Sequence, residues 1–150
     1  MKTLVITLCL SLLLAMPASA CMGPQTESAQ EYDASVLFEG KPTSYVLHLG
    51  EMPGVTSGGL SKVTFSVDRT LRGSPQKTWN VLMRGRDLPK NLSAFKRRFG
   101  STMTVGVRDF GAKVDPRKFP RGFQTTYFIV DAACSMNGED WLLRPIGAHE

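Results

Sequence analysis

The strongest constraint on the fold of this chain is an alternation of apolar and polar residues with a period of two, between Leu60 and Leu71. Its apolar members are Val63, Phe65 and Val67, and its polar members are Thr64, Ser66 and Asp68. Because successive side chains of a β-strand point to opposite faces, this pattern predicts a strand with one buried face. The turn sequence Arg72-Gly73-Ser74-Pro75 follows, so Trp79 to Met83 is predicted to form the partner strand of a hairpin.

Other segments have strand or helix character. Strands are predicted at Ser35 to Gly40, Ser44 to Leu49, Thr102 to Asp109 and Thr125 to Cys134, and the first two are interpreted as one strand bent at Pro42. Apolar residues at helical spacing predict a helix over Leu88 to Phe99, and a second short helix is expected over Gln25 to Asp33. The segments Glu51 to Gly59 and Gly111 to Gly122 are predicted loops.

These elements predict an all-β fold with one or two short helices. A small antiparallel barrel or sandwich fits about five strands, and closure is favoured because an open sheet would expose unpaired edges. A long bent first strand, and a helix between the third and fourth strands, match the five-stranded Greek-key barrel of the OB type. The length of 150 residues is typical of a single domain.

The first twenty residues have the pattern of an export signal. Lys2 precedes an apolar run from Leu4 to Ala15, and Ala18-Ser19-Ala20 matches a signal-peptidase site. The run is too short to span a membrane as a helix. We therefore expect a signal peptide at 1–20, a mature domain at 21–150, and a periplasmic or secreted protein.

The number of cysteines in the mature chain bears on the chemical state of Cys21, its first residue. Cys9 is lost with the signal, so Cys21 and Cys134 remain as a pair in an oxidising compartment, and we expect a disulfide that ties the amino terminus to the region of the last strand. The alternative is an envelope lipoprotein anchored through Cys21. Ala18-Ser19-Ala20-Cys21 can be read as a lipobox, but a poor one, because Ala stands where Leu is usual. A lipidated Cys21 could not form a disulfide.

Basic residues are concentrated in one part of the chain. The full sequence has a net charge of +5, and eleven basic residues face three acidic ones between Arg84 and Arg121. They form either a solvated face or a patch for an anionic partner, such as lipid headgroups of the envelope or an acidic protein. The candidate patch residues are Arg84, Arg86, Lys96, Arg97, Arg98, Lys113, Arg117, Lys118 and Arg121.

Nucleic acid is not expected as a partner of an exported protein. Phenylalanines are interleaved with the basic residues, and we predict that they are core residues or hydrophobic plugs under loops. They are Phe95, Phe99, Phe110, Phe119 and Phe123.

Catalytic patterns are weak. His48 and His149 stand in no nucleophile spacing, and Glu139 and Asp140 are adjacent rather than facing. No His, Cys or Asp cluster has the spacing of metal ligands. We expect a non-enzymatic protein with no cofactor and no metal.

Three motifs occur in order along the chain. Cys21 and a short predicted helix precede Ala34 to Lys41 (ASVLFEGK), Val63 to Val67 precedes Leu71-Arg72-Gly73, and Cys134 follows a strand. These motifs resemble bacterial proteins similar to tissue inhibitors of metalloproteinases and to netrin-like modules, over Cys21 to about Cys134. The resemblance implies an OB-type barrel whose first residue is tied to a late cysteine, and a protein-binding or scaffold role.

The resemblance also implies an alternative function, inhibition of a zinc metalloprotease. In the animal inhibitors the amine and carbonyl of the first cysteine bind the catalytic zinc and the next residue enters the specificity pocket, so Cys21 would be the chelator and Met22 the pocket residue. The opening Cys21-Met22-Gly23-Pro24 lacks the second cysteine of those inhibitors. A protein-binding or scaffold module is therefore the leading expectation.

Overall fold

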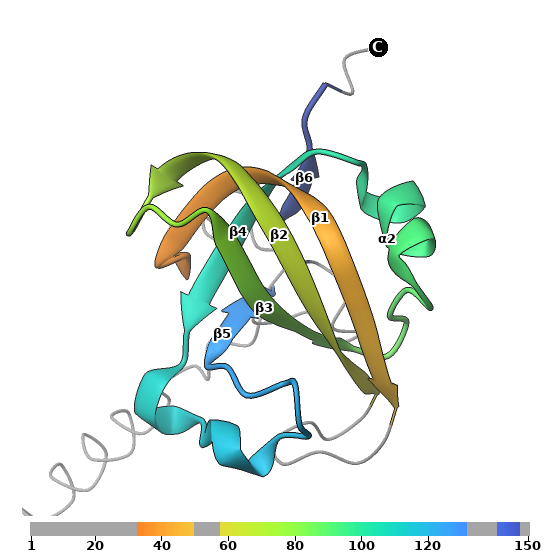
Figure 1. Cartoon of the computed structure of the whole chain (residues 1–150), viewed down its shortest axis with the longest axis vertical. Helices are drawn as coiled ribbons and strands as arrows, with labels where there is room; N and C mark the ends of the chain where they lie inside the picture. Colours follow the sequence, from red (N-terminus) through yellow and green to blue (C-terminus); the bar gives the residue numbers. More distant parts are fainter. Residues whose placement is uncertain (1–32, 50–57, 132–140, 148–150) are drawn as a thin grey trace, which may run out of the picture.

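The barrel is built on two long paired strands. The computed structural model describes residues 33–49, 58–131 and 141–147 (Figure 1). β1 (Val36–Leu49) and β2 (Gly59–Arg72) are antiparallel, and their register shifts at three places, one of them between Pro42 and Ser44. Such bulges bend a strand and increase its twist, so that one ribbon can wrap around a core. The prediction of a single strand bent at Pro42 is confirmed.

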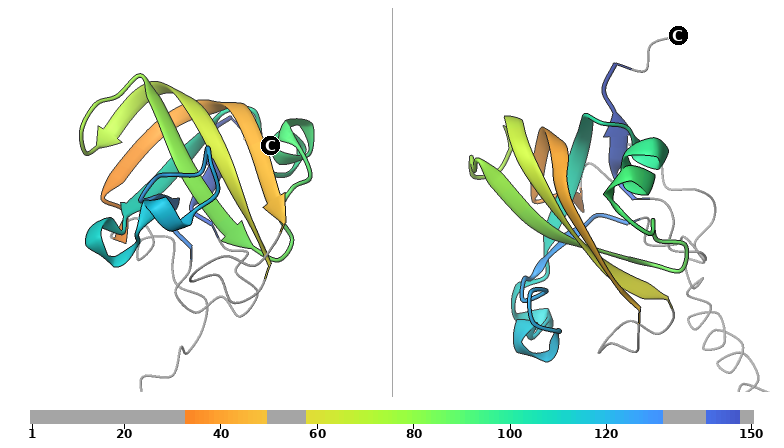
Figure 2. Two further views of the ribbon diagram at one scale, coloured as in Figure 1. Left: turned by 60° about the horizontal axis from the view of Figure 1, so that its bottom comes forward. Right: turned by 45° about the vertical axis from the view of Figure 1, so that its right-hand side comes forward.

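Three further strands close the barrel. These are β3 (Thr78–Gly85), β4 (Met103–Asp109) and β5 (Tyr127–Ile129). The strand order is β1-β2-β3-β5-β4, and β1 also pairs with β4 (Figures 1 and 2). The predicted small five-stranded OB-like barrel is confirmed.

One pairing in the ring differs from the prediction of an antiparallel barrel. β3 and β5 run parallel where Leu82 faces Phe128. Strand direction cannot alternate everywhere around a closed ring with an odd number of strands, so at least one pair must be parallel. The other pairings of the barrel are antiparallel.

α2 (Leu92–Phe99) follows β3 and precedes β4 in the sequence. It packs against the barrel. The predicted start at Leu88 is wrong by one turn, because the side chain of Asn91 accepts a hydrogen bond from the Ala94 N–H at 2.9 Å and caps the helix there. Phe95 is fully buried among the inward-facing side chains of the strands. The helix thus contributes one large side chain to the barrel core.

The carboxyl-terminal part of the barrel is less regular than predicted. β5 covers only three residues of the predicted strand from Thr125, and the end of that prediction, 132–134, lies outside the described residues. A sixth strand, β6 (Leu143–Pro145), was not predicted and pairs with β4. Gly106 of β4 allows this region to pack closely, since a Cβ atom there would lie 1.9 Å from Leu142 Cδ2.

The predicted loop over Gly111 to Gly122 contains two short 3-10 turns, η1 (Gly111–Lys113) and η2 (Pro116–Lys118). Of the predicted helix over Gln25 to Asp33, only Asp33 belongs to the described residues. Within the described ranges, no helix has the length and apolar character that a membrane crossing requires.

Candidate functional site

The residues predicted to form the disulfide are Cys21 and Cys134, and those predicted to contact a protease are Cys21 and Met22. All three residues lie outside the part of the chain that the structure describes. The disulfide and the protease contact therefore stay predictions, and the candidate site is built from the described part of the chain.

The first group of predicted patch residues lies on α2. Lys96, Arg97 and Arg98 form its last turn, where cationic side chains complement the negative end of the helix dipole. Arg98 Nη1 donates to the Asp87 carbonyl oxygen at 2.6 Å. The Arg98 guanidinium also lies 5.1 Å from the Phe99 ring centroid and 5.5 Å from that of Trp141.

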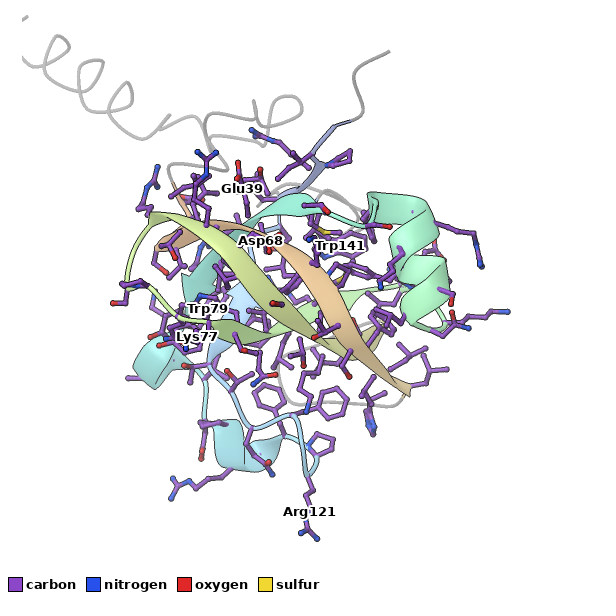
Figure 3. The ribbon with its side chains drawn as sticks, turned by 45° about the horizontal axis from the view of Figure 1, so that its top comes forward. Glu39, Asp68, Lys77, Trp79, Arg121 and Trp141 are labelled. Atoms are coloured by element: carbon purple, nitrogen blue, oxygen red, sulfur yellow. The ribbon has the colours of Figure 1, made fainter. Side chains whose placement is uncertain are left out.

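The second group lies on the segment 110–126, which we call the basic loop. It carries Lys113, Arg117, Lys118 and Arg121, all of them exposed. Arg117 Nε donates to Asp115 Oδ1 at 3.0 Å, and this side-chain hydrogen bond lowers the pKa of Asp115 below its ordinary value. Arg121 extends from the loop away from the barrel (Figure 3).

The last two patch residues lie at and beyond the end of β3. Arg84 Nε donates to Asp131 Oδ2 at 3.0 Å, and its guanidinium lies 6.0 Å from the Phe110 ring centroid. Arg86 is exposed. α2 and the basic loop lie at well-separated places on the barrel in every view (Figures 1 and 2), so the basic residues of α2 and those of the loop do not form one surface.

The basic loop is held on the barrel by its own hydrophobic cluster. Phe119 and Phe123 are buried on the outer face of the barrel against Leu60, Leu82 and Phe128. Phe110 and Val114 pack against the same cluster. The prediction that the phenylalanines are core residues or plugs under loops is confirmed, since Phe95 and Phe99 belong to or pack against the barrel core.

Short side-chain contacts order the backbone of the loop. Asp109 Oδ1 accepts from the Gly111 N–H at 2.7 Å, and Asp115 Oδ1 accepts from the Arg117 N–H at 3.1 Å. Gln124 Oε1 accepts from the Gly122 N–H at 3.0 Å. Such contacts stabilise a loop conformation without strand pairing.

A pocket lies where this loop meets the outer face of β2 and β3. It is open to solvent, has a volume of about 240 Å³ and is lined by Lys62, Asn80, Gly122, Phe123, Gln124 and Thr125. Pairing places the outward-facing Lys62 opposite Leu82 and Thr64 opposite Asn80. The loop covers the apolar half of this face, around Leu60 and Leu82, and the pocket forms beside it in the polar half.

The polar groups of the pocket are mostly donors. Thr64 Oγ1 donates to Asn80 Oδ1 at 2.8 Å, and Gln124 Oε1 is occupied by the Gly122 N–H. The two side-chain NH₂ groups and the Lys62 ammonium remain as donors. Lys62 Nζ lies 5.9 Å from the Phe123 ring centroid, and no carboxylate of the described residues forms an ion pair with it.

Sequence reasoning missed this site. Lys62 lies before the basic stretch that begins at Arg84, and its position on the polar phase of β2 was the available signal. Asn80 and Gln124 belong to no recognisable sequence motif. They are 44 residues apart in the sequence, and only strand pairing and the anchored loop bring them together. His48 is half-buried, with its ring 5.8 Å from that of Phe123.

Among the residues that the structure describes, no group of three or more His, Cys, Asp or Glu side chains could hold a metal ion. Comparisons with family models, with curated proteins and with solved structures found no match to this chain.

Proposed function

We propose that this protein is an exported, non-enzymatic protein-binding module of the netrin-like type, and that it binds its partner through the outer face of β2 and β3 and the basic loop. The observation that carries the proposal is the anchored basic loop beside an open pocket. Binding residues are commonly found on loops that a rigid scaffold positions. Other barrels of the OB type bind ligands with the corresponding strand face and loop.

The order of the loop favours binding. Burial of Phe119 and Phe123 fixes the loop before a partner arrives, so less conformational entropy is lost on association. In the described part of the chain, Lys113, Lys118 and Arg121 form no ion pair, so their charges are available to an acidic surface. Complementary charge raises the rate of association with such a surface.

Two further features support the proposal. The closed five-stranded barrel is the fold that the family resemblance implies. The export signal at 1–20 would deliver the mature domain to a compartment where Cys21 and Cys134 can form a disulfide.

Intact mass spectrometry of the exported protein tests the processing. We expect a mass that has lost residues 1–20 and two hydrogens, as a single disulfide requires. Added acyl mass would contradict this and support the lipoprotein alternative, in which the basic surfaces face anionic headgroups.

Binding to fractionated envelope material tests the function. We expect saturable retention of the mature protein on envelope proteins, lost in the double variant Lys118→Glu/Arg121→Glu and kept in the matched control Lys96→Glu/Arg97→Glu on α2. Extracted envelope lipids form the second arm. Retention on lipids alone, or equal losses in both variants, would contradict the proposal.

A further inference from the structure

We infer that the pocket formed by Lys62, Asn80 and Gln124 binds the carboxylate of an acidic side chain presented by a protein partner. This inference rests on the proposed function and names the chemistry that the binding surface recognises. It uses residues that lie outside the basic stretch of the sequence.

The hydrogen-bonding state of the pocket selects an acceptor. The oxygens of both side-chain amides already accept hydrogen bonds, from Thr64 Oγ1 and from the Gly122 N–H. The lining offers two amide NH₂ groups and one ammonium as donors, and the Thr125 hydroxyl, which accepts from the Tyr127 N–H at 3.3 Å, can also donate. A carboxylate has about four acceptor sites and no donor when ionised, so it matches this set.

The charge of the pocket matches a singly charged anion. Lys62 is the one formally charged residue among the six that line it. A carboxylate carries one negative charge, whereas a phosphate monoester carries about 1.5 to 2 at neutral pH. One ammonium with neutral donors therefore balances a carboxylate more closely than a phosphate.

The size and walls of the pocket match a single side chain. Its volume of about 240 Å³ is below the range of roughly 300 to 1,000 Å³ that is usual for small-molecule sites. Phe123 forms part of the lining, with the His48 ring against it, and offers apolar surface to the methylene groups of a glutamate. The surrounding basic loop would attract the acidic segment that carries this residue.

Nuclear magnetic resonance titration of the ¹⁵N-labelled mature protein tests the inference with defined probes. We expect hexaglutamate to shift the Gly122 amide and the side-chain NH₂ signals of Asn80 and Gln124 saturably, while hexaglutamine leaves them unchanged. Both peptides are acetylated at the amino terminus and amidated at the carboxyl terminus, so that carboxylates are present only on the glutamate side chains. Higher salt should weaken the interaction, because the attraction is electrostatic. Inorganic phosphate and vesicles that contain phosphatidylglycerol are the comparison probes.

Substitutions at Lys62 supply the controls. Lys62→Met keeps the apolar stem and removes the charge, and we expect it to weaken hexaglutamate binding about ten-fold or more. Lys62→Arg should restore most of the affinity. The matched control Lys96→Met on α2 should bind within about two-fold of the wild type, and the dispersion of the amide spectrum shows that each variant is folded.

Several results would overturn the inference. They are equal hexaglutamate binding by the wild type and Lys62→Met, shifts on α2 as large as those at the pocket, tighter binding of phosphate, or binding to vesicles without a response to hexaglutamate. If the pocket fails while retention on envelope proteins still depends on Lys118 and Arg121, the proposed function stands and only the inference falls. If hexaglutamate binds the pocket but envelope proteins are not retained, the function fails and the anion site stands.

Discussion

The last turn of α2 and the basic loop contain the same residue types but use them differently. On α2, Lys96, Arg97 and Arg98 complement the helix dipole, and Arg98 also bonds the Asp87 carbonyl oxygen. On the loop, a cluster of phenylalanines anchors the backbone, and Lys118 and Arg121 extend from it with no ion pair among the described residues. The cations of α2 thus complement the helix dipole, whereas on the loop Arg117 is paired with Asp115 and Lys118 and Arg121 form no ion pair among the described residues.

This comparison shows why basic residues that are neighbours in the sequence are not one surface. The barrel places α2 and the loop far apart, while it brings Lys62 of β2 to the edge of the loop.

The largest effect on stability is expected from Phe95→Ala, which leaves a cavity in the core beneath α2. Phe95 is fully buried and contacts Tyr45, Phe65 and Phe99. The free energy of unfolding should fall by about 3–5 kcal/mol. Urea denaturation measures it, and a loss below about 1 kcal/mol would show that α2 is not part of the core.

Phe123→Ala should cost less, roughly 2–3 kcal/mol, because the cluster under the loop lies at the surface and can partly collapse. Hydrogen exchange should show lost protection over 110–126 with the barrel strands still protected. Loss of protection throughout the barrel would mean that the loop and the barrel unfold as one unit, which would contradict an independently anchored loop.

Charge reversal compares the two regions directly. Lys96→Glu/Arg97→Glu should lower the free energy of unfolding by roughly 0.6–2 kcal/mol, because anions at the carboxyl end of a helix oppose its dipole. Lys118→Glu/Arg121→Glu should change it by less than about 0.5 kcal/mol. Thermal denaturation at low salt measures both, and equal losses would remove the distinction between the two regions.

The smallest effect concerns the packing of Tyr45 on Phe95 beside α2. Burial raises the pKa of the Tyr45 phenol, while the Ser61 hydroxyl and the charge of Arg98 oppose the rise. The folded state therefore holds this proton more tightly than the unfolded state, whose phenol has a pKa of about 10. Its contribution to stability is complete below that pH and is lost as the pH rises through the folded pKa.

Comparison with Tyr45→Phe isolates this contribution. The difference in the free energy of unfolding between the two proteins should be constant below about pH 9 and should shift in favour of the variant above about pH 10. Urea denaturation across this range measures it. A difference that does not change with pH would show that the phenol is equally solvated in both states.

The sequence predicted the long strands because each has one buried and one exposed face. Val63 and Phe65 point into the barrel and Thr64 points out, which a two-residue period reports directly. β5 was predicted too long because Phe128, Ile129 and Val130 are all buried, in three different clusters, so no alternation marks where pairing ends. β6 has three residues and no pattern of its own, and its place depends on β4.

The pocket could not be predicted for a related reason. Its lining comes from two strands and a loop, and the loop is held by Phe119 and Phe123, whose burial the sequence indicated without indicating the surface they cover. Sequence spacing reports the environment of a residue along one element. It does not report which elements meet at Lys62.

Lysine footprinting tests most directly whether the binding surface is the basic loop with the outer face of β2 and β3, and not α2. The mature protein is acetylated with and without envelope proteins, and peptide mass spectrometry reads each lysine. We expect slower acetylation of Lys62, Lys113 and Lys118, while Lys96 on α2 and Lys90, which precedes α2, react as before. Protection of Lys90 and Lys96, with the loop lysines as reactive as before, would contradict this expectation.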